Sequence, residues 1–266
     1  MPKIELATGP TIHYVRRGEG QPLLLIQGMS GNHLAWGEPF LGDLERDFDL
    51  VAYDHRGVGH SSVVTDPFSI KDMADDAAAL IDALGWESAH VVGISMGGMV
   101  AQELALRHPD RIRTLTLGCT YSGGEGSALA SSQVSTKLAE AMMSGDPDRA
   151  IATAYEVNVS PGYGADKSAY GTFYEMATAL PTPVPVIMLQ MQAVMGHDTS
   201  ARLGSIEAPT LVVHGTEDRM LPVVNGELIA RLIPHARLEL LEGVGHMFWW
   251  EQPERSAALV RSHVLA

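Results

Sequence analysis

The fold is decided by the stretch Val91-Val92-Gly93-Ile94-Ser95-Met96-Gly97-Gly98-Met99-Val100. A strand-like apolar run, Ala89 to Ile94, leads directly into a helix-like run, Met96 to Arg107, with Ser95 at the joint. So sharp a turn strains the backbone of the joint residue and brings strand and helix close together, which glycines at 93 and 97 permit. The pattern predicts that the serine oxygen is exposed above a sheet, beside the N-terminus of a helix. This is the position in which such folds place a nucleophile.

On its own, a Gly-x-Ser-x-Gly pattern also occurs by chance in glycine-rich loops. The position of this one between a strand and a helix favours the nucleophile interpretation. Four further segments occur in a fixed order around it: Leu24-Leu25-Ile26-Gln27-Gly28-Met29, Asp54-His55-Arg56-Gly57-Val58-Gly59-His60-Ser61, His214-Gly215-Thr216-Glu217-Asp218 and Gly245-His246.

With these five segments the chain resembles the α/β-hydrolase superfamily over nearly its whole length, in particular its serine esterase and enol-lactonase-like branch. The resemblance implies an α/β-hydrolase fold, in which a mostly parallel central sheet is flanked by helices and carries an inserted helical cap. Five matching segments in the family's order are far more specific than any one of them.

The pattern of apolar runs agrees with such a sheet. Several runs are apolar on both faces, as expected of parallel strands covered by helices, and Ser95 follows a central one. We expect strands at 11–15, 23–26, 48–53, 89–94, 112–118, 210–214 and 236–241. We expect helices from Ser69 to Gly85, at 96–107 and 222–232, and from Pro253 towards the C-terminus.

Between the strand that ends at 118 and the strand that begins at 210, the pattern becomes typical of short helices and is rich in methionine and aromatic residues. We therefore predict a core formed by residues 1–119 and 202–266 and a helical cap formed by residues 120–201. Methionines adapt to irregular apolar surfaces, so we expect the cap to supply a hydrophobic pocket wall, although packing of cap helices on the core is the simpler explanation for any individual methionine. The predicted substrate contacts are Gly28, Met188, Met191 and Trp249.

A serine hydroxyl needs a base, and the base needs an orienting partner. The serine elbow predicts the chain order serine, acid, histidine, with the acid after one late strand and the histidine after the next. Asp218 and His246 occupy these two positions. Glu217 is the alternative acid, but Asp218 matches the spacing Gly-x-x-Asp from Gly215. The predicted catalytic residues are Ser95, Asp218 and His246.

The predicted oxyanion hole consists of two main-chain N–H groups. One belongs to Met96, at the start of the helix, and the resemblance implies Met29 as the second. Gln27 stands where the family usually has histidine. Because the hole uses main-chain groups, this substitution should not abolish it, but it leaves the packing of the loop open.

Other polar residues receive structural interpretations. Asp54 and Arg56 are expected to brace loops beside the active site, and Cys119 is expected to be a small buried side chain rather than a second nucleophile. His33 and His197 could line the pocket, but the sequence has no His-x-x-x-His or similar ligand spacing. We predict no metal and no cofactor.

Charge and length limit the partners and the compartment. The chain has 266 residues, with 32 acidic against 18 basic ones and a formal charge of −14, which argues against nucleic acid and anionic membranes as partners. Its N-terminus lacks the apolar core of a signal peptide, and a single cysteine cannot form an internal disulfide. We expect a cytoplasmic protein whose partner is a small-molecule ester or lactone, with a homodimer as an option.

The resemblance implies a serine hydrolase that cleaves a carboxylic ester or lactone of a small, largely apolar substrate through an acyl-enzyme on Ser95. Serine at the elbow disfavours haloalkane dehalogenase and epoxide hydrolase chemistry, because those relatives use a carboxylate there. Carbon-carbon bond hydrolases and cofactor-free haloperoxidases or perhydrolases share the same triad and stay open as alternatives. A ligand receptor with slow turnover is an alternative of a different class.

Overall fold

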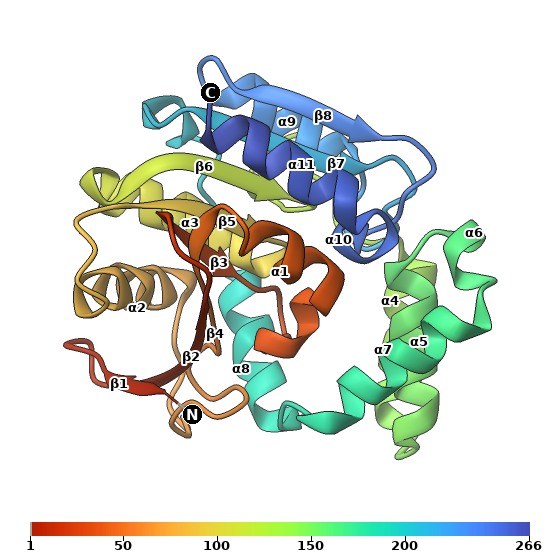
Figure 1. The fold of residues 1–266 in the computed structure, drawn as a ribbon. Helices are drawn as coiled ribbons and strands as arrows, with labels where there is room; N and C mark the ends of the chain where they lie inside the picture. The colour runs from red at the N-terminus through yellow and green to blue at the C-terminus, as the bar shows by residue number, and fades with distance from the viewer. Residues whose placement is uncertain (1) are drawn as a thin grey trace.

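The computed structural model describes residues 2–266 and contains one eight-stranded sheet (Figure 1). Its strands are β1 (Lys3–Glu5), β2 (Thr11–Arg17), β3 (Gln21–Ile26), β4 (Phe48–Tyr53), β5 (Ala89–Ile94), β6 (Ile112–Gly118), β7 (Thr210–Gly215) and β8 (Arg237–Leu241). The spatial order is β1-β2-β4-β3-β5-β6-β7-β8. Only the pairings of β1 with β2 and of β2 with β4 are antiparallel among these strands, so the predicted mostly parallel sheet is confirmed.

Helices cover both faces of the sheet. They are α1 (Glu38–Leu44), α2 (Ile70–Ala83), α3 (Met96–Arg107), α9 (Val224–Leu232), α10 (Phe248–Glu251) and α11 (Pro253–Val264). Apolar side chains of α2, α3 and α9 belong to one core, and those of α1, α10 and α11 to the other. Alternate residues of β3 enter the two cores, with Leu24 and Ile26 in the first and Leu23 and Leu25 in the second. This is why β3 is apolar on both faces.

Local signals explain where α2 begins and ends. The Ser69 side chain accepts a hydrogen bond from the main-chain N–H of Asp72, and the Asp72 side chain accepts one from Ser69 in return, which forms a capping box. The helix gives way to Gly85 at φ 76°, a conformation that favours glycine. The short edge strand β1 and the seven-residue helix α1 were not expected, because neither is long enough to show a clear hydrophobic period.

The elbow between β5 and α3 has the predicted strain. The backbone of Ser95 has φ 53° and ψ −123°, a combination that residues other than glycine rarely adopt. A Cβ at Gly93 would lie 2.3 Å from the carbonyl oxygen of Gly97, so the strand and the helix do approach too closely for a side chain there. A Cβ at Gly97 would lie 2.0 Å from the carbonyl oxygen of Ile26. The second glycine is therefore required by the neighbouring strand β3 rather than by β5.

The chain between β6 and β7 forms helices, and residues 120–201 contain no strand in this structure. The helices are α4 (Ser132–Met143), α5 (Pro147–Asn158), α6 (Pro161–Gly164), α7 (Lys167–Ala179) and α8 (Val184–Met195). In Figure 1 α4 to α7 gather to the right of the sheet, and α8 returns below it. Side chains tie these helices to the loop after β3: Asn32 donates to the carbonyl of Leu180 at 2.9 Å, and Gln190 accepts from the N–H of Ser30 at 2.8 Å.

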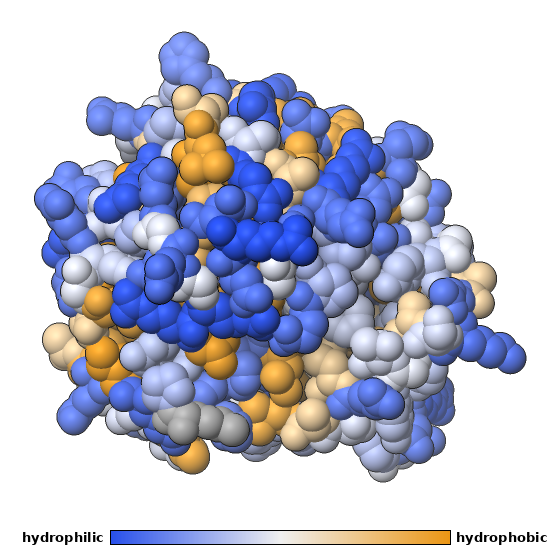
Figure 2. Space-filling model, viewed as in Figure 1, coloured by the Kyte–Doolittle hydropathy of each residue, from blue (hydrophilic) through white to orange (hydrophobic). Residues whose placement is uncertain are grey.

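Helix α8 presents an apolar stripe to solvent. Val184, Met188, Met191 and Met195 follow one another at intervals of four, three and four residues, and all four are exposed. Figure 2 shows apolar surface at the place where α8 lies in Figure 1. Met188 and Met191 are 53% and 37% exposed, so their predicted contact with a substrate stays a prediction.

Between residues 2 and 266 we find no helix with the length and apolar character needed to cross a membrane.

The approach of α3 to β3 makes Gly97 a test of the fold. We expect Gly97→Ala to lower the free energy of unfolding by about 3 kcal/mol or more, because the added methyl group overlaps main-chain atoms that cannot rotate away. This loss should outweigh the gain of about 1 kcal/mol that alanine has over glycine in a helix. Urea denaturation measures the difference. Gly171→Ala in α7 is the control, because its Cβ would meet no atom within 4 Å; equal stability of the two variants would contradict the prediction.

Candidate active site

The loops that follow four neighbouring strands carry the candidate residues. Ser95 follows β5, Cys119 follows β6, Asp218 lies after β7 and His246 after β8. Because β5, β6, β7 and β8 are adjacent and parallel, their carboxyl ends share one edge of the sheet. The sheet topology thus brings together residues that are up to 151 positions apart in the sequence.

Asp218 and His246 form a buried pair. The Nδ1 of His246 lies 2.7 Å from Oδ2 of Asp218. The other carboxylate oxygen accepts the main-chain N–H groups of Met220 and Leu221, each at 2.8 Å. A second imidazole, that of His214, places Nε2 3.2 Å from Oδ2 of Asp218. These contacts fix the carboxylate and commit Nδ1 of His246 to it.

Gly215 lets the loops of Asp218 and His246 approach each other. A Cβ on Gly215 would lie 2.3 Å from the carbonyl oxygens of Val244 and Gly245. The main-chain N–H of Glu217 donates to the carbonyl of Val244 at 2.9 Å and joins the two loops directly. Gly215 therefore permits the close approach of the loops that carry Asp218 and His246. It is also the residue from which the spacing Gly-x-x-Asp favours Asp218 over Glu217, and Glu217 is exposed.

The charges of the pair stabilise each other. Burial would raise the pKa of Asp218, but the charge of His246 and the hydrogen bonds from His214 and His246 outweigh it and hold that pKa well below its ordinary value. Burial would lower the pKa of His246, but the adjacent Asp218 carboxylate outweighs it and raises the pKa well above the ordinary 6.5. Asp218 is therefore placed to stabilise a positive charge that develops on His246.

Ser95 is held by its main chain and leaves its hydroxyl unused. Its N–H donates to the carbonyl of Gly118 at 2.9 Å, and its carbonyl accepts from Oγ1 of Thr120 at 2.6 Å. The side chain is partly exposed, and its Oγ has no hydrogen-bond partner among residues 2–266. The hydroxyl is thus available to an incoming molecule.

Cys119 is fully buried between these loops. Its Sγ and single ligand atoms of Asp218 and His246 all lie within 4.8 Å of one another. Burial is the main influence on the thiol and raises its pKa, so the group stays protonated and is a poor nucleophile. This agrees with the interpretation of Cys119 as a small buried side chain.

The loop after β3 lies against the serine. A Cβ on Gly28 would be 3.0 Å from the Cβ of Ser95. Gln27, which replaces the family's usual histidine, is buried and accepts the N–H of Gly28 through Oε1 at 2.7 Å. Within the described chain, the N–H groups of Met29 and Met96 donate to no partner. The loop that contains Gln27 is thus packed so that neither predicted oxyanion donor, the N–H of Met29 or that of Met96, is used in a hydrogen bond within the described chain.

The C-terminal end of α5 is hydrogen-bonded to the loops that carry Asp218 and His246. The Glu251 carboxylate accepts the N–H of Ser160 at 2.9 Å and the N–H of Gly245 at 2.9 Å. The N–H of Met247 donates to the carbonyl of Asn158 at 2.9 Å. On the Asp218 side, Arg219 donates to the carbonyls of Glu156 and Val159.

Sequence reasoning missed Glu251. Its only signal is a carboxylate five residues after His246, and nothing in the sequence links it to position 160. Burial raises the pKa of Glu251 despite its hydrogen bonds from Ser160 and Gly245.

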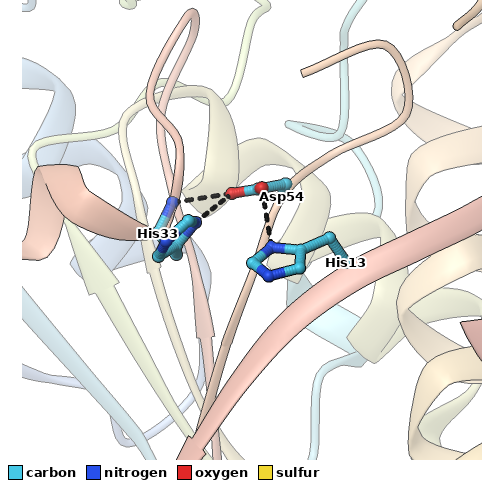
Figure 3. Close-up of side chains that lie close together, drawn as sticks. All are labelled: His13, His33 and Asp54. Atoms are coloured by element: carbon cyan, nitrogen blue, oxygen red, sulfur yellow. Dashed lines mark hydrogen bonds and ion pairs between the residues drawn. The ribbon is translucent and has the colours of Figure 1, made fainter. Parts of the chain in front are cut away.

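A second buried carboxylate, Asp54, lies at the end of β4 (Figure 3). It accepts from Nδ1 of His13 at 2.9 Å, from Nδ1 and the N–H of His33 at 2.8 Å each, and from the N–H of His60 at 3.0 Å. Arg56 separately donates to Asp76 at 2.7 Å. Asp54 and Arg56 thus make the kind of bracing contacts expected of them, and His13 is fully buried and structural.

His13, His33 and Asp54 are residue types that bind metals, so their distances matter. Ligands of a tetrahedral zinc ion lie roughly 3.4 Å from one another, given Zn–N and Zn–O lengths of about 2.1 Å. The Nδ1 atoms of both histidines lie at only 2.8 and 2.9 Å from the carboxylate oxygens. The cluster is arranged as direct hydrogen bonds, which stabilise a carboxylate that would otherwise be costly to bury.

A cavity of about 750 Å³ lies between the core and α7. Its walls come from the 3-10 helix η1 (His33–Trp36), α1, β2, α7 and the segment around α10. Trp249, one of the predicted substrate contacts, lines it, whereas Gly28, Met188, Met191 and the three predicted catalytic residues do not.

Comparison with known proteins places this architecture in a family. The model of the α/β hydrolase fold family matches residues 21–253. The chain belongs to this family, and its eight-stranded sheet with helices on both faces is the α/β-hydrolase fold. The resemblance inferred from the five sequence segments is confirmed.

Individual relatives cover nearly the whole chain. A protein of Azorhizobium caulinodans provisionally named as the carbamate hydrolase RutD is 30% identical over 238 residues, which are 89% of this chain and 88% of that protein. The esterase RhEst1 of Rhodococcus sp. ECU1013 is 26% identical with a TM-score of 0.86, covering 100% and 98% of the two chains. Est816, described as an N-acyl homoserine lactone degrading enzyme, is 30% identical with a TM-score of 0.81 and coverage of 98% and 99%.

The charge coupling of Asp218 and His246 can be measured without a substrate. We expect Asp218→Asn to lower the pKa of His246, because it removes the carboxylate that raises it and leaves the opposing effect of burial. Titration of the imidazole proton signals by NMR reports this pKa, with the His246 signal identified from a His246→Gln variant. Glu217→Gln is the matched control and should leave the titration unchanged. An unaltered His246 pKa in Asp218→Asn would refute the coupling.

Proposed function

We propose that this protein is a serine hydrolase that cleaves a carboxylic ester or lactone of a small, largely apolar substrate through an acyl-enzyme on Ser95. The observation that carries the proposal is the meeting, at one edge of the sheet, of a strained serine with an unused hydroxyl and a buried Asp218–His246 pair joined at 2.7 Å. A buried carboxylate that orients a histidine is the arrangement by which a serine is activated.

In the proposed reaction, Nε2 of His246 takes the proton of Ser95 while Oγ attacks the acyl carbon. Asp218 keeps the proton on Nδ1 and stabilises the imidazolium that forms. The N–H groups of Met29 and Met96 receive the negative charge on the substrate oxygen, and each such donor typically lowers the barrier by about 3 kcal/mol. His246 then returns its proton to the leaving alcohol, and the acyl group remains on Ser95.

A water molecule completes the cycle. His246 takes a proton from this water, whose oxygen attacks the acyl carbon, and the bond to Ser95 breaks as the serine recovers its proton. The carboxylic acid is released and the enzyme returns to its starting state. In a lactone the acyl and alcohol parts belong to one molecule, so the same two steps yield a single hydroxy acid.

The relatives support this range of substrates. RhEst1 is named an esterase and Est816 a lactone-degrading enzyme, and both superimpose over nearly the whole chain. We propose residues 120–201 as the cap over the site, with Gly28, Met188, Met191 and Trp249 as substrate contacts. Gly28 has the strongest support, since it lies against Ser95, and Trp249 has the weakest, since it lines a cavity from which Ser95 is absent.

Carbamate hydrolysis is a second candidate, favoured by the relative named for that activity. It requires the same attack of Ser95 on an acyl carbon, so the geometry of the triad does not separate it from ester hydrolysis. Comparison of p-nitrophenyl butyrate, γ-butyrolactone and p-nitrophenyl carbamate by kcat/KM ranks the three classes. An ester or lactone should be preferred; a clear preference for the carbamate would favour the second candidate.

The role of Ser95 is tested with p-nitrophenyl esters from acetate to octanoate. We expect sustained turnover that favours the longer acyl chains, and we expect Ser95→Ala to lower kcat by a factor on the order of 10⁶, as removal of a nucleophilic serine can. Ser95→Ala should also lose covalent labelling by a fluorophosphonate while its circular dichroism spectrum is kept. Ser262→Ala, at an exposed serine of α11, is the control. Labelling of Ser95→Ala at the wild-type rate would overturn the assignment.

A further inference from the structure

We infer that the cavity of about 750 Å³ between η1 and α7 is a second ligand site, built for a small neutral aromatic molecule that carries a hydroxyl group, such as a phenol. Ser95, Asp218 and His246 are absent from its walls, which are fully described. Its volume lies in the range of about 300–1,000 Å³ that is usual for small-molecule sites. The inference does not depend on the proposed function.

Aromatic rings form much of the wall. Trp36, Tyr163, Trp249 and Trp250 all line the cavity. The indole N–H groups of Trp249 and Trp250 both donate to the carbonyl of Ala35, at 2.9 and 2.8 Å. Neither indole N–H group is therefore available to a ligand. Trp249 is only 4% exposed, so the partly exposed rings of Trp250 and Tyr163 are the ones that present apolar surface to the cavity. Such surfaces favour aromatic ligands, which can stack on them or meet them edge-on.

His33 supplies a polar group on this apolar wall. Its Nδ1 and its main-chain N–H are both committed to Asp54, each at 2.8 Å, as Figure 3 shows for the pair. Nε2 is the remaining ring nitrogen, and it has no hydrogen-bond partner in residues 2–266. Since a carboxylate only accepts, Nδ1 carries the proton, and Nε2 of the neutral ring has a lone pair. A hydroxyl group on the ligand can donate to it.

The resemblance to the other dyad is close. Asp54 orients His33 through Nδ1 at 2.8 Å, and Asp218 orients His246 through Nδ1 at 2.7 Å. In each case a buried carboxylate fixes the tautomer and direction of an imidazole. No serine or cysteine is among the residues that line this cavity, and its threonine, Thr172, donates to the carbonyl of Ser168 rather than to His33. It is therefore suited to binding and not to acyl transfer.

Charges at the rim exclude anionic ligands. Arg17 is the one basic residue besides His33 on the cavity wall, and it is already paired with Glu38 at 2.9 Å and with Glu45. Glu175 stands on the wall formed by α7 without a basic partner there. A carboxylate or phosphate would meet net negative charge, whereas a neutral phenol would not.

The test is binding of 4-ethylphenol, followed by isothermal titration calorimetry and by the fluorescence of the tryptophans on the wall. The matched probe is 4-ethylanisole, which has the same ring and ethyl group but cannot donate a hydrogen bond. We expect one molecule of 4-ethylphenol per chain, and about tenfold weaker binding of the ether, because a single hydrogen bond is lost.

Three variants locate the site. Ala169→Trp places a large ring on the cavity wall and should abolish binding, whereas Ala179→Trp, an exposed position of the same helix outside the cavity, should bind normally. His33→Asn keeps a donor near the position of Nδ1 but lacks Nε2, and should bind the phenol about as weakly as wild type binds the ether. Ester hydrolysis is measured in parallel, so that loss of the second site is distinguished from loss of catalysis.

Three results would overturn the inference. The first is the absence of binding to the wild-type protein by both methods. The second is equal binding of the phenol and the ether, which would remove the role of His33. The third is unchanged phenol binding by Ala169→Trp, which would place the molecule elsewhere, such as beside Ser95.

Discussion

The rest of the structure depends on the close approach of α3 to the sheet. Neither Gly93 nor Gly97 has room for a Cβ, because main-chain carbonyl oxygens would lie 2.3 Å and 2.0 Å away. Only at this separation can β5 turn into α3 within one residue, which leaves Ser95 at a positive φ. The strain at this residue is tolerated because two strands and a helix are packed around it. The exposed hydroxyl is thus a consequence of backbone packing.

Buried carboxylates organise the edge of the sheet above this contact. Asp218 and Asp54 are both shielded from solvent, and each is surrounded by N–H groups of main chain and imidazole. A carboxylate in such a place is stable only when its lone pairs are satisfied, so the donors around it are held in fixed directions. The same physical requirement orients His246 at the edge of the sheet that carries Ser95, and His33 beside the aromatic cavity.

Helix α5, in the helical segment between β6 and β7, contacts the loops that carry the candidate site. Carbonyl groups at the end of α5 receive hydrogen bonds from Arg219 and Met247, the residues next to Asp218 and His246. Glu251 adds a bridge between Ser160 and Gly245. A change in the position of α5 would therefore be transmitted to both loops.

The sequence by itself determined the core strands and the elbow, because apolar runs, glycine positions and capping residues such as Ser69 are local signals. It also indicated Asp218 and His246, since their place after late strands is a matter of order along the chain. It could not find Glu251, the imidazoles around Asp54 or the aromatic cavity. These depend on contacts between residues such as Ser160 and Gly245, or His13 and Asp54, which lie tens of positions apart. Only tertiary packing decides such contacts, because side chains remote in sequence meet only after the strands have aligned and residues 120–201 have packed against the sheet and its loops.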